Sequence, residues 1–234
     1  MTYLMSDLHG QYELYMKMLE KIRFSDRDEL YVLGDIVDRG PKPMAILRDM
    51  SLRINVFPFM GNHDMTAKII LSELNKEITS ENLSLGSFDL GFIVALKCWI
   101  EDGGGSTLED FRQLSPDERE DVLAYLDEFI PCDEIEVNGT RYVLAHAGVE
   151  GFSPDKPLTD YAPEAFIDGR CDYGRRYFPD KILVTGHTPT LKIDPACKGK
   201  IWQGNGHIAL DCGAGYGLPL GCIRLEDMQT FYVE

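Results

Sequence analysis

Two acidic side chains and an arginine follow a short apolar run near residue 30. Leu30–Leu33 is apolar and ends at Gly34, which favours a buried strand that leads into a loop. Asp35 and Asp38 lie on that loop, and Arg39 comes directly after them. Buried carboxylates beside an arginine are costly unless they are paired or bind a cation. Taken alone, this loop fits a metal or phosphate site, and it fits equally well a solvated turn with an Asp–Arg pair.

Four more loops with polar side chains follow apolar segments that predict strands. These segments span residues 2–5, 54–59, 141–145 and 182–185. The side chains that follow them are Asp7 and His9, Asn62 and His63, His146, and His187. Each histidine alone would more simply be a core or surface residue. Four of the chain's five histidines share this position, however, and ligand sites of open α/β sheets lie at the carboxyl ends of the strands.

The residue types in this set predict its ligand. A mixture of carboxylate, imidazole and amide groups favours manganese, iron or zinc over calcium. Two cations about 3.5–4 Å apart, the arrangement in two-metal hydrolases, need a carboxylate that both can share. Asp35 stands in the middle of the set, so we expect it to be the bridge.

Composition excludes several classes of function. The formal charge of −16 and the pI of about 4.7 disfavour electrostatic binding of DNA or RNA. The six cysteines are scattered without a CxxC pair, which argues against a zinc ribbon or a dithiol redox motif. The opening MTYLMSD lacks a basic, apolar leader, and no later run predicts a membrane span. These features favour the cytoplasm and no membrane partner.

The chain predicts one α/β domain over residues 1–234, with a mostly helical insertion at about 72–130. A glycine run, Gly103–Gly105, lies inside the insertion and is most simply a flexible connector. It is no nucleotide P-loop, because no Gly-Lys-Ser/Thr follows it. Farther along, Ser115, Pro116 and Glu118 predict the start of a capped helix.

Five motifs, in the order SDLHG, GDIVDRG, GNHD, HAG and GHT, resemble those of the phosphoprotein phosphatase family of binuclear metallophosphoesterases. They span Asp7 to His187, and GDIVDRG is the most specific of them. The short chain is similar to the compact bacterial and phage members. The resemblance implies a β-sandwich of two central mixed sheets flanked by helices.

The resemblance also implies roles for individual residues. It places Asp7, His9 and Asp35 on one metal ion, and Asp35, Asn62, His146 and His187 on a second. His63 matches the general acid, Asp38 the residue that orients it, and Arg39 a phosphate-binding arginine. For the second such arginine, Arg170 is the best match, with Arg175 and Arg176 as rivals that we interpret as a solvated basic turn. The segment Gly103–Thr107, after Trp99, is similar to a glycine-rich stretch near the substrate mouth of bacterial members.

Two positions depart from the family pattern. Asp64 stands where most members have glutamate, which shortens a contact behind the ligands. Asp168 stands where bacterial members often have tryptophan, so contacts with the substrate are expected to differ.

The leading hypothesis is therefore a metal-dependent phosphoesterase that acts on phosphoserine or phosphothreonine in proteins. Attack would come from a hydroxide between two divalent ions, manganese first, with iron or zinc as alternatives. A second hypothesis is a symmetrical diadenosine tetraphosphatase, which acts on a small phosphorylated substrate and shares every metal motif. A third is a catalytically inactive scaffold that binds phosphorylated partners; the intact metal and acid positions argue against it.

Overall fold

Two five-stranded sheets form the centre of the computed structural model, which describes residues 1–78 and 90–234. The strands of the first sheet, in the order β10-β9-β1-β2-β3, are β1 (Thr2–Met5), β2 (Glu29–Val32), β3 (Val56–Pro58), β9 (Leu220–Arg224) and β10 (Gln229–Val233). Strands β1, β2 and β3 are parallel, and β9 and β10 extend the sheet in antiparallel fashion.

The second sheet has the order β4-β5-β6-β8-β7. Its strands are β4 (Cys132–Val137), β5 (Thr140–Ala145), β6 (Lys181–Thr185), β7 (Trp202–Gly204) and β8 (His207–Ala209). The parallel strands β5, β6 and β8 lie in its middle, with β4 and β7 antiparallel at the edges. Asn138 and Gly139, both with positive φ, form the two-residue turn between β4 and β5 that the Asn-Gly pair predicts.

The strands of the first sheet bury both faces, and alternate residues belong to different cores. Leu4 packs with Tyr142 and Ile208 in a cluster that joins the two sheets. Tyr3 and Met5 point the other way, into a cluster shared with the helices. This alternation follows from the two-residue period of a strand. The predicted sandwich of two mixed sheets flanked by helices is confirmed.

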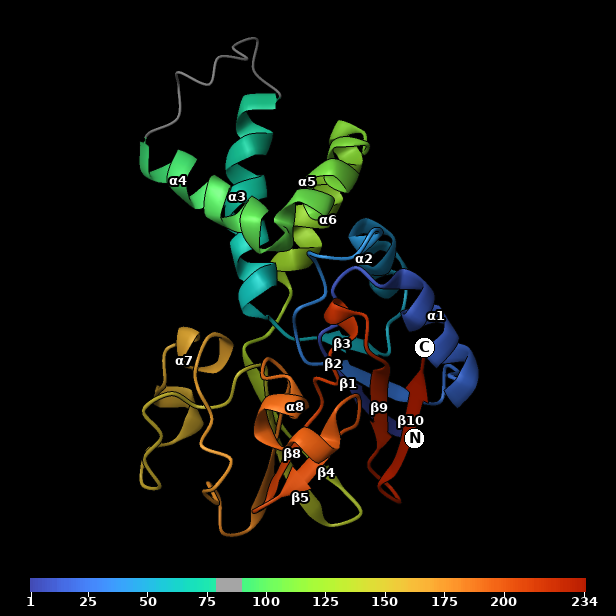
Figure 1. Ribbon diagram of the computed structural model, residues 1–234, viewed down its shortest axis with the longest axis vertical. Helices are drawn as coiled ribbons and strands as arrows, with labels where there is room; N and C mark the ends of the chain where they lie inside the picture. The colour runs from blue at the N-terminus through green and yellow to red at the C-terminus, as the bar shows by residue number, and fades with distance from the viewer. Residues whose placement is uncertain (79–89) are drawn as a thin grey trace.

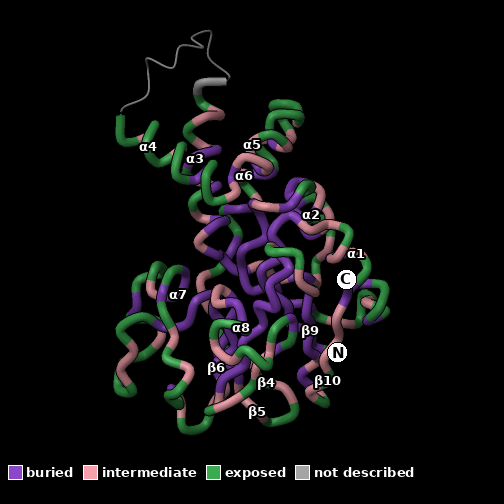
Figure 2. Tube along the Cα trace, viewed as in Figure 1, coloured by how far each residue is buried: buried purple, intermediate pink, exposed green. Residues whose placement is uncertain are grey.

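Helices cover the outer faces and form a projection at one end (Figure 1). α1 (Tyr12–Ile22) and α2 (Pro43–Ser51) lie beside the first sheet, and α3 (Asn62–Ile78), α4 (Leu90–Trp99), α5 (Gly105–Arg112) and α6 (Pro116–Asp127) form the projection. A π-helical turn, Ile100–Gly104, joins α4 to α5, and the predicted capping box of Ser115 and Glu118 starts α6. Figure 2 shows that burial is concentrated around the strands, whereas much of α4 is exposed.

The remaining helical elements are short. They are α7 (Glu164–Ile167), α8 (Thr190–Ile193) and the 3₁₀ turns η3 (Leu158–Asp160), η4 (Pro195–Cys197) and η5 (Ala214–Tyr216). In the part of the chain that the structure describes, no helix is both long enough and apolar enough to cross a bilayer.

Candidate active site

The loops after β1, β2, β5 and β6 are hydrogen-bonded to one another at one edge of the sandwich. Asp7 N donates to Gly34 O at 3.0 Å, and His9 N donates to Asp35 O at 2.9 Å. The backbone N–H of His187 donates to the Asp7 carboxylate at 3.0 Å, which joins the loop after β6 to the loop after β1. The strand-end positions read from the sequence therefore meet in space.

Six of the site residues share an uncommon backbone conformation. Positive φ angles of 43–71° occur at Asp7, His9, Asp35, Asp38, Arg39 and His187. A left-handed conformation costs roughly 1–3 kcal/mol for a residue with a side chain, and such strain is concentrated at functional sites. The strands and the hydrogen bonds between loops hold these residues in place against that cost.

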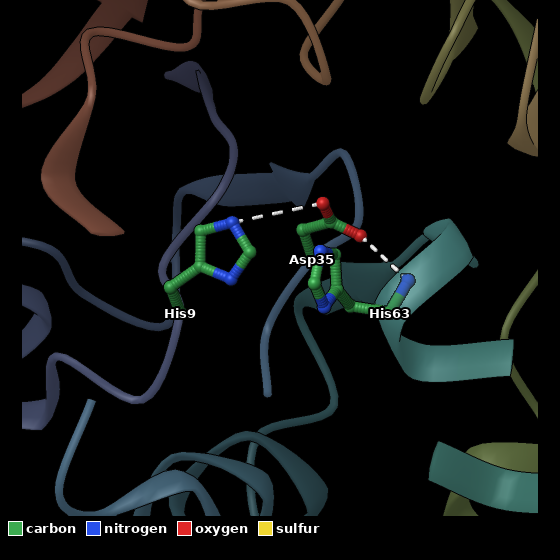
Figure 3. A group of neighbouring side chains, drawn as sticks. All are labelled: His9, Asp35 and His63. Atoms are coloured by element: carbon green, nitrogen blue, oxygen red, sulfur yellow. Dashed lines mark hydrogen bonds and ion pairs between the residues drawn. The ribbon is translucent and has the colours of Figure 1, made fainter. Parts of the chain in front are cut away.

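The Asp35 carboxylate stands at the centre, and its two oxygens face different histidines. Oδ1 lies 3.3 Å from His146 Nε2, and Oδ2 lies 3.7 Å from His9 Nε2. Figure 3 shows the second contact, together with the bond that His63 N donates to Oδ1 at 3.1 Å. Two groups of potential metal ligands share Asp35: one adds His9 and His63, and the other adds His146 and His187.

Backbone carbonyls fix the orientation of two imidazoles. His9 Nδ1 lies 3.0 Å from Val37 O, and His146 Nδ1 lies 2.7 Å from Leu33 O. A neutral imidazole that donates from Nδ1 presents the lone pair of Nε2, which is how proteins orient metal-binding histidines. Both Nε2 atoms face Asp35, so their lone pairs point into the site.

Three further donor atoms converge beside His146. The amide oxygen of Asn62 lies 3.1 Å from His146 Nε2 and 2.9 Å from His187 Nδ1. The two ring nitrogens are themselves 3.2 Å apart. Lone pairs gathered at this spacing suit a cation better than they suit one another.

The electrostatics of the site also fit bound cations. Burial works to raise the pKa of Asp35, but His146 and His9 hold it well below its usual range. Burial raises the pKa of Asp7 well above its usual range, and the Asp211 carboxylate adds to that rise. Burial lowers the pKa of His9 to about 3, which leaves a neutral imidazole. Burial works to lower the pKa of His146, but the charge of Asp35 and its bond to the ring raise that pKa to about 10, so this imidazole takes up a proton beside the carboxylate. A divalent cation can replace that proton and stabilise the set, because buried charges need pairing or metal coordination.

Asp211 is a member of this site that the sequence analysis missed. Its side chain is 3% exposed, and burial raises its pKa to about 6. It follows the end of β8, so the strand-end argument applied to the other loops would also have found it. The carboxylate accepts a bond from Gly213 N at 2.9 Å, which ties it to the turn before β9.

His63 and Asp38 form a buried pair. His63 Nδ1 donates to Asp38 Oδ2 at 2.7 Å. The indole N–H of Trp99 donates to the same oxygen at 2.9 Å, and the Thr107 hydroxyl donates to Oδ1 at 2.7 Å. Burial works to lower the pKa of His63, but the bond to Asp38 and the charge of Asp35 raise it overall. The pair can therefore hold a proton at the imidazole.

Arg39 lies between two of the histidines. One terminal nitrogen of its guanidinium is 2.5 Å from His9 Nε2, and the other is 2.8 Å from His63 Nε2. The exposed Asp102 carboxylate lies 3.8 Å from Arg39 and 3.7 Å from His63 Nε2. A planar guanidinium in this position can bind an incoming phosphate with two parallel hydrogen bonds.

The prediction that Gly103–Gly105 is a flexible connector is wrong. Gly103, with a φ of 111°, accepts a bond from Arg39 N at 2.9 Å. A Cβ on Gly104 would lie 2.2 Å from the Trp99 ring. These glycines allow the π-helical turn to pack directly against Trp99 and Arg39.

The Asp64 carboxylate joins two of the site loops. Oδ1 accepts bonds from Ile36 N and Val37 N at 2.9 and 3.2 Å, and Oδ2 accepts from Gly61 N at 3.0 Å. Asp64 thus supports the loops behind the ligands even though it is shorter than the glutamate usual at this position.

The candidate phosphate-binding arginines differ in their contacts. Arg175 lies over the rings of Phe152 and Tyr177, and Arg176 donates to two backbone carbonyls. Arg170 is exposed and forms no hydrogen bond or ion pair with any residue in 1–78 or 90–234. The role of Arg170 therefore stays a prediction; Asp168, two residues earlier, raises the pKa of His187 against the larger lowering effect of burial.

Comparisons with known proteins agree with this geometry. A sequence model described as calcineurin-like phosphoesterase matches residues 2–191. A symmetrical bis(5'-nucleosyl)-tetraphosphatase from Buchnera aphidicola is 34% identical, with 100% of this chain and 98% of the relative covered. An asymmetrical bis(5'-nucleosyl)-tetraphosphatase from Geobacillus thermodenitrificans is 26% identical, with 98% and 92% covered.

Solved structures show the same fold. A crystal structure provisionally described as that of a diadenosine tetraphosphatase has a TM-score of 0.65 at 17% identity, with 99% of this chain and 92% of that chain covered. A serine/threonine protein phosphatase from Saccharomyces cerevisiae has a TM-score of 0.62 at 13% identity, with 100% and 80% covered.

These comparisons contradict the prediction of a serine/threonine protein phosphatase that acts on phosphoproteins. The two relatives described above, which span nearly the whole chain, are tetraphosphatases, and the likeness to the yeast phosphatase is one of fold. The physical reason for the error is that the motifs hold cations and one phosphate. They carry no information about the group attached to that phosphate.

Proposed function

The chain belongs to the calcineurin-like phosphoesterase family, and on that premise we propose that this metal-dependent phosphoesterase hydrolyses dinucleoside polyphosphates, with diadenosine tetraphosphate cleaved symmetrically. The observation that carries the proposal is the 34% identity with a symmetrical bis(5'-nucleosyl)-tetraphosphatase over the full length of both chains. A likeness that covers both proteins end to end includes the substrate side as well as the metal motifs.

We assign the metal ligands from the resemblance of the motifs together with the geometry around Asp35. One cation would be held by Asp7, His9 and Asp35, and the second by Asp35, Asn62, His146 and His187. The opposed oxygens of Asp35 and the fixed Nε2 lone pairs of His9 and His146 support this assignment. We favour manganese over magnesium because imidazole ligands prefer the softer ion.

Side chains around the cations would do the remaining work. When bound, the two cations supply positive charge for the phosphoryl oxygens and acidify water. Arg39 would bind the polyphosphate through its guanidinium fork, helped by Arg170 on the loop after α7. His63 would give its proton to the leaving oxygen, and Asp38 would hold the imidazole in the orientation that this step needs. Trp99 and Thr107 support Asp38 through the hydrogen bonds already described.

The products of one reaction test the proposal. The protein, loaded with manganese, is incubated with diadenosine tetraphosphate, and the nucleotides are separated by chromatography. Two molecules of ADP per substrate are expected. ATP with AMP would instead support the asymmetrical reaction, which is the one in the name of the Geobacillus relative. No release of nucleotide would contradict the proposal. A magnesium-loaded sample should turn over more slowly.

A further inference from the structure

Tyr216 is a large aromatic side chain exposed beside the site. It lies on the 3₁₀ turn η5 and remains 60% exposed. The guanidinium carbon of Arg39 lies 4.7 Å from the centre of its ring. Tyr216 thus rests against the residue that we assign to the polyphosphate, and much of its surface is open to solvent.

The turn that carries Tyr216 is fixed to the site. Gly213 and Gly217, with φ of 94° and 76°, bound the turn, and the Asp211 carboxylate accepts a bond from Gly213 N at 2.9 Å. Gly215 packs so closely on the imidazole of His9 that a Cβ there would lie 2.4 Å from its Cδ2. The position of the Tyr216 ring is therefore fixed by contacts with His9 and Asp211, two residues of the candidate active site.

We propose that Tyr216 is a stacking platform for a nucleobase of the substrate, so that it selects dinucleotides over phosphate compounds that lack a base. The proposal rests on the proposed function. The Arg39 guanidinium occupies one side of the Tyr216 ring. A base on the open side would place the ring between the base and the guanidinium. Every nucleobase has a π-face, so this contact recognises the class and tolerates different bases.

The geometry of a dinucleoside polyphosphate suits this arrangement. Its phosphates are anionic and its ends carry flat aromatic bases, so a guanidinium beside an aromatic ring matches both parts of the molecule. The competing explanation is that Tyr216 only steadies Arg39. In that case its loss would weaken hydrolysis of every phosphate substrate by the same factor.

Kinetics on two substrates separate these explanations. The values of kcat/KM for diadenosine tetraphosphate and for inorganic tripolyphosphate, which has no base, are measured for wild type and Tyr216→Leu. We expect the variant to lose roughly 5- to 100-fold on the dinucleotide, the size of one base–aromatic stack, and several-fold less on tripolyphosphate. Tyr216→Phe and Tyr216→Trp should keep most of the dinucleotide activity.

A matched control is Phe231→Leu. Phe231 lies on β10, and its ring centre is 5.6 Å from the guanidinium carbon of Arg224 on β9, so the variant also removes an aromatic ring beside an arginine. This control should leave the ratio of the two substrates unchanged. Equal losses on both substrates in Tyr216→Leu would overturn the stacking proposal. A wild type that cleaves tripolyphosphate and not the dinucleotide would instead contradict the proposed function.

Binding without turnover gives an independent readout. In the Tyr216→Trp variant, fluorescence is followed as ADP or pyrophosphate is added, with wild type correcting for Trp99 and Trp202. Quenching by ADP but not by pyrophosphate is expected from a stacked base. Identical responses to the two ligands would refute a base contact at this position.

Discussion

Asp38 accepts a hydrogen bond from Nδ1 of His63 at 2.7 Å while its own side chain is completely buried. Trp99 and Thr107 also donate to this carboxylate, so its oxygens are satisfied by side-chain hydrogen bonds although they are buried. A buried carboxylate that faces one ring nitrogen fixes the imidazole and favours a proton on the ring. In this arrangement Asp38 fixes the tautomer of His63, and the imidazole can act as a proton donor.

Replacing His63 with Asn should lower kcat by a factor that depends on the leaving group. Phenol needs a proton as it leaves, because its pKa is about 10, whereas nitrophenolate leaves readily without one. We expect a loss of about 100-fold or more on phenyl phosphate and a much smaller loss on nitrophenyl phosphate. Asp38→Asn should show the same selectivity more weakly. Equal losses on both esters, with metal content unchanged, would mean that His63 positions phosphate.

Removing the charge of Asp35 should release both cations together. A neutral amide in Asp35→Asn bridges two divalent ions poorly, and each oxygen of Asp35 faces a different histidine. We expect the bound metal, measured after dialysis, to fall well below two ions per chain, with turnover falling in parallel. Asp102→Asn is the control, because that exposed carboxylate lies near Arg39 and should not affect metal content. Two ions retained by Asp35→Asn would place the bridge on another residue.

Neighbouring glycines should respond differently to the same substitution. In Gly104→Ala the new Cβ would lie 2.2–2.5 Å from three atoms of the Trp99 ring, so Trp99 must move away from Asp38. We expect a loss of about 1–3 kcal/mol in the free energy of unfolding, with reduced turnover.

The control for this change is Gly105→Ala, whose Cβ would meet Ile100 at an ordinary 3.7 Å. It should be neutral, or stabilising by up to about 1 kcal/mol, because alanine is the better helix former. Urea denaturation of both variants measures the difference. Equal stabilities would show that the turn adjusts to a methyl group.

The fold and the meeting of the strand-end loops could be predicted because both depend on local patterns. Apolar segments that end in a glycine or a polar loop give the strands, and the carboxyl ends of parallel strands meet at one edge. The sequence therefore predicts that His9, Asp35 and His146 lie close together, as the structure shows. The two-residue Asn138-Gly139 turn and the Ser115 cap were found for the same reason.

The side chains that support Asp38, and the aromatic ring beside Arg39, could not be predicted because they come from distant parts of the chain. Trp99 and Thr107 reach Asp38 from 61 and 69 residues away, and no local period of the sequence encodes those contacts. The left-handed backbone at His9 and Asp35 is likewise imposed by the surrounding loops. Tyr216 stands in a short turn whose place beside Arg39 appears only in three dimensions.

His207, the histidine that lies outside the candidate active site, should make folding stability depend on pH. It is 2% exposed, its Nε2 lies 2.9 Å from the Thr185 hydroxyl, and its Nδ1 has no hydrogen-bond partner among the described residues. Its ring stacks on Tyr173 at 4.8 Å, and burial lowers its pKa from 6.5 to about 3. Between these pH values the unfolded chain binds a proton that the native state does not.

Stability should therefore fall as the pH decreases from 6.5, with a contribution from His207 of up to about 1.4 kcal/mol per pH unit. His207→Gln removes the titrating group, so its free energy of unfolding should decline less steeply than that of wild type between pH 6.5 and pH 4.5. Above pH 7.5 the imidazole is neutral in both states, and the two curves should run parallel. Urea denaturation at each pH measures both slopes. Parallel curves over the acidic range would mean that the native state accepts the proton, with a relaxed packing of Tyr173 around a charged ring.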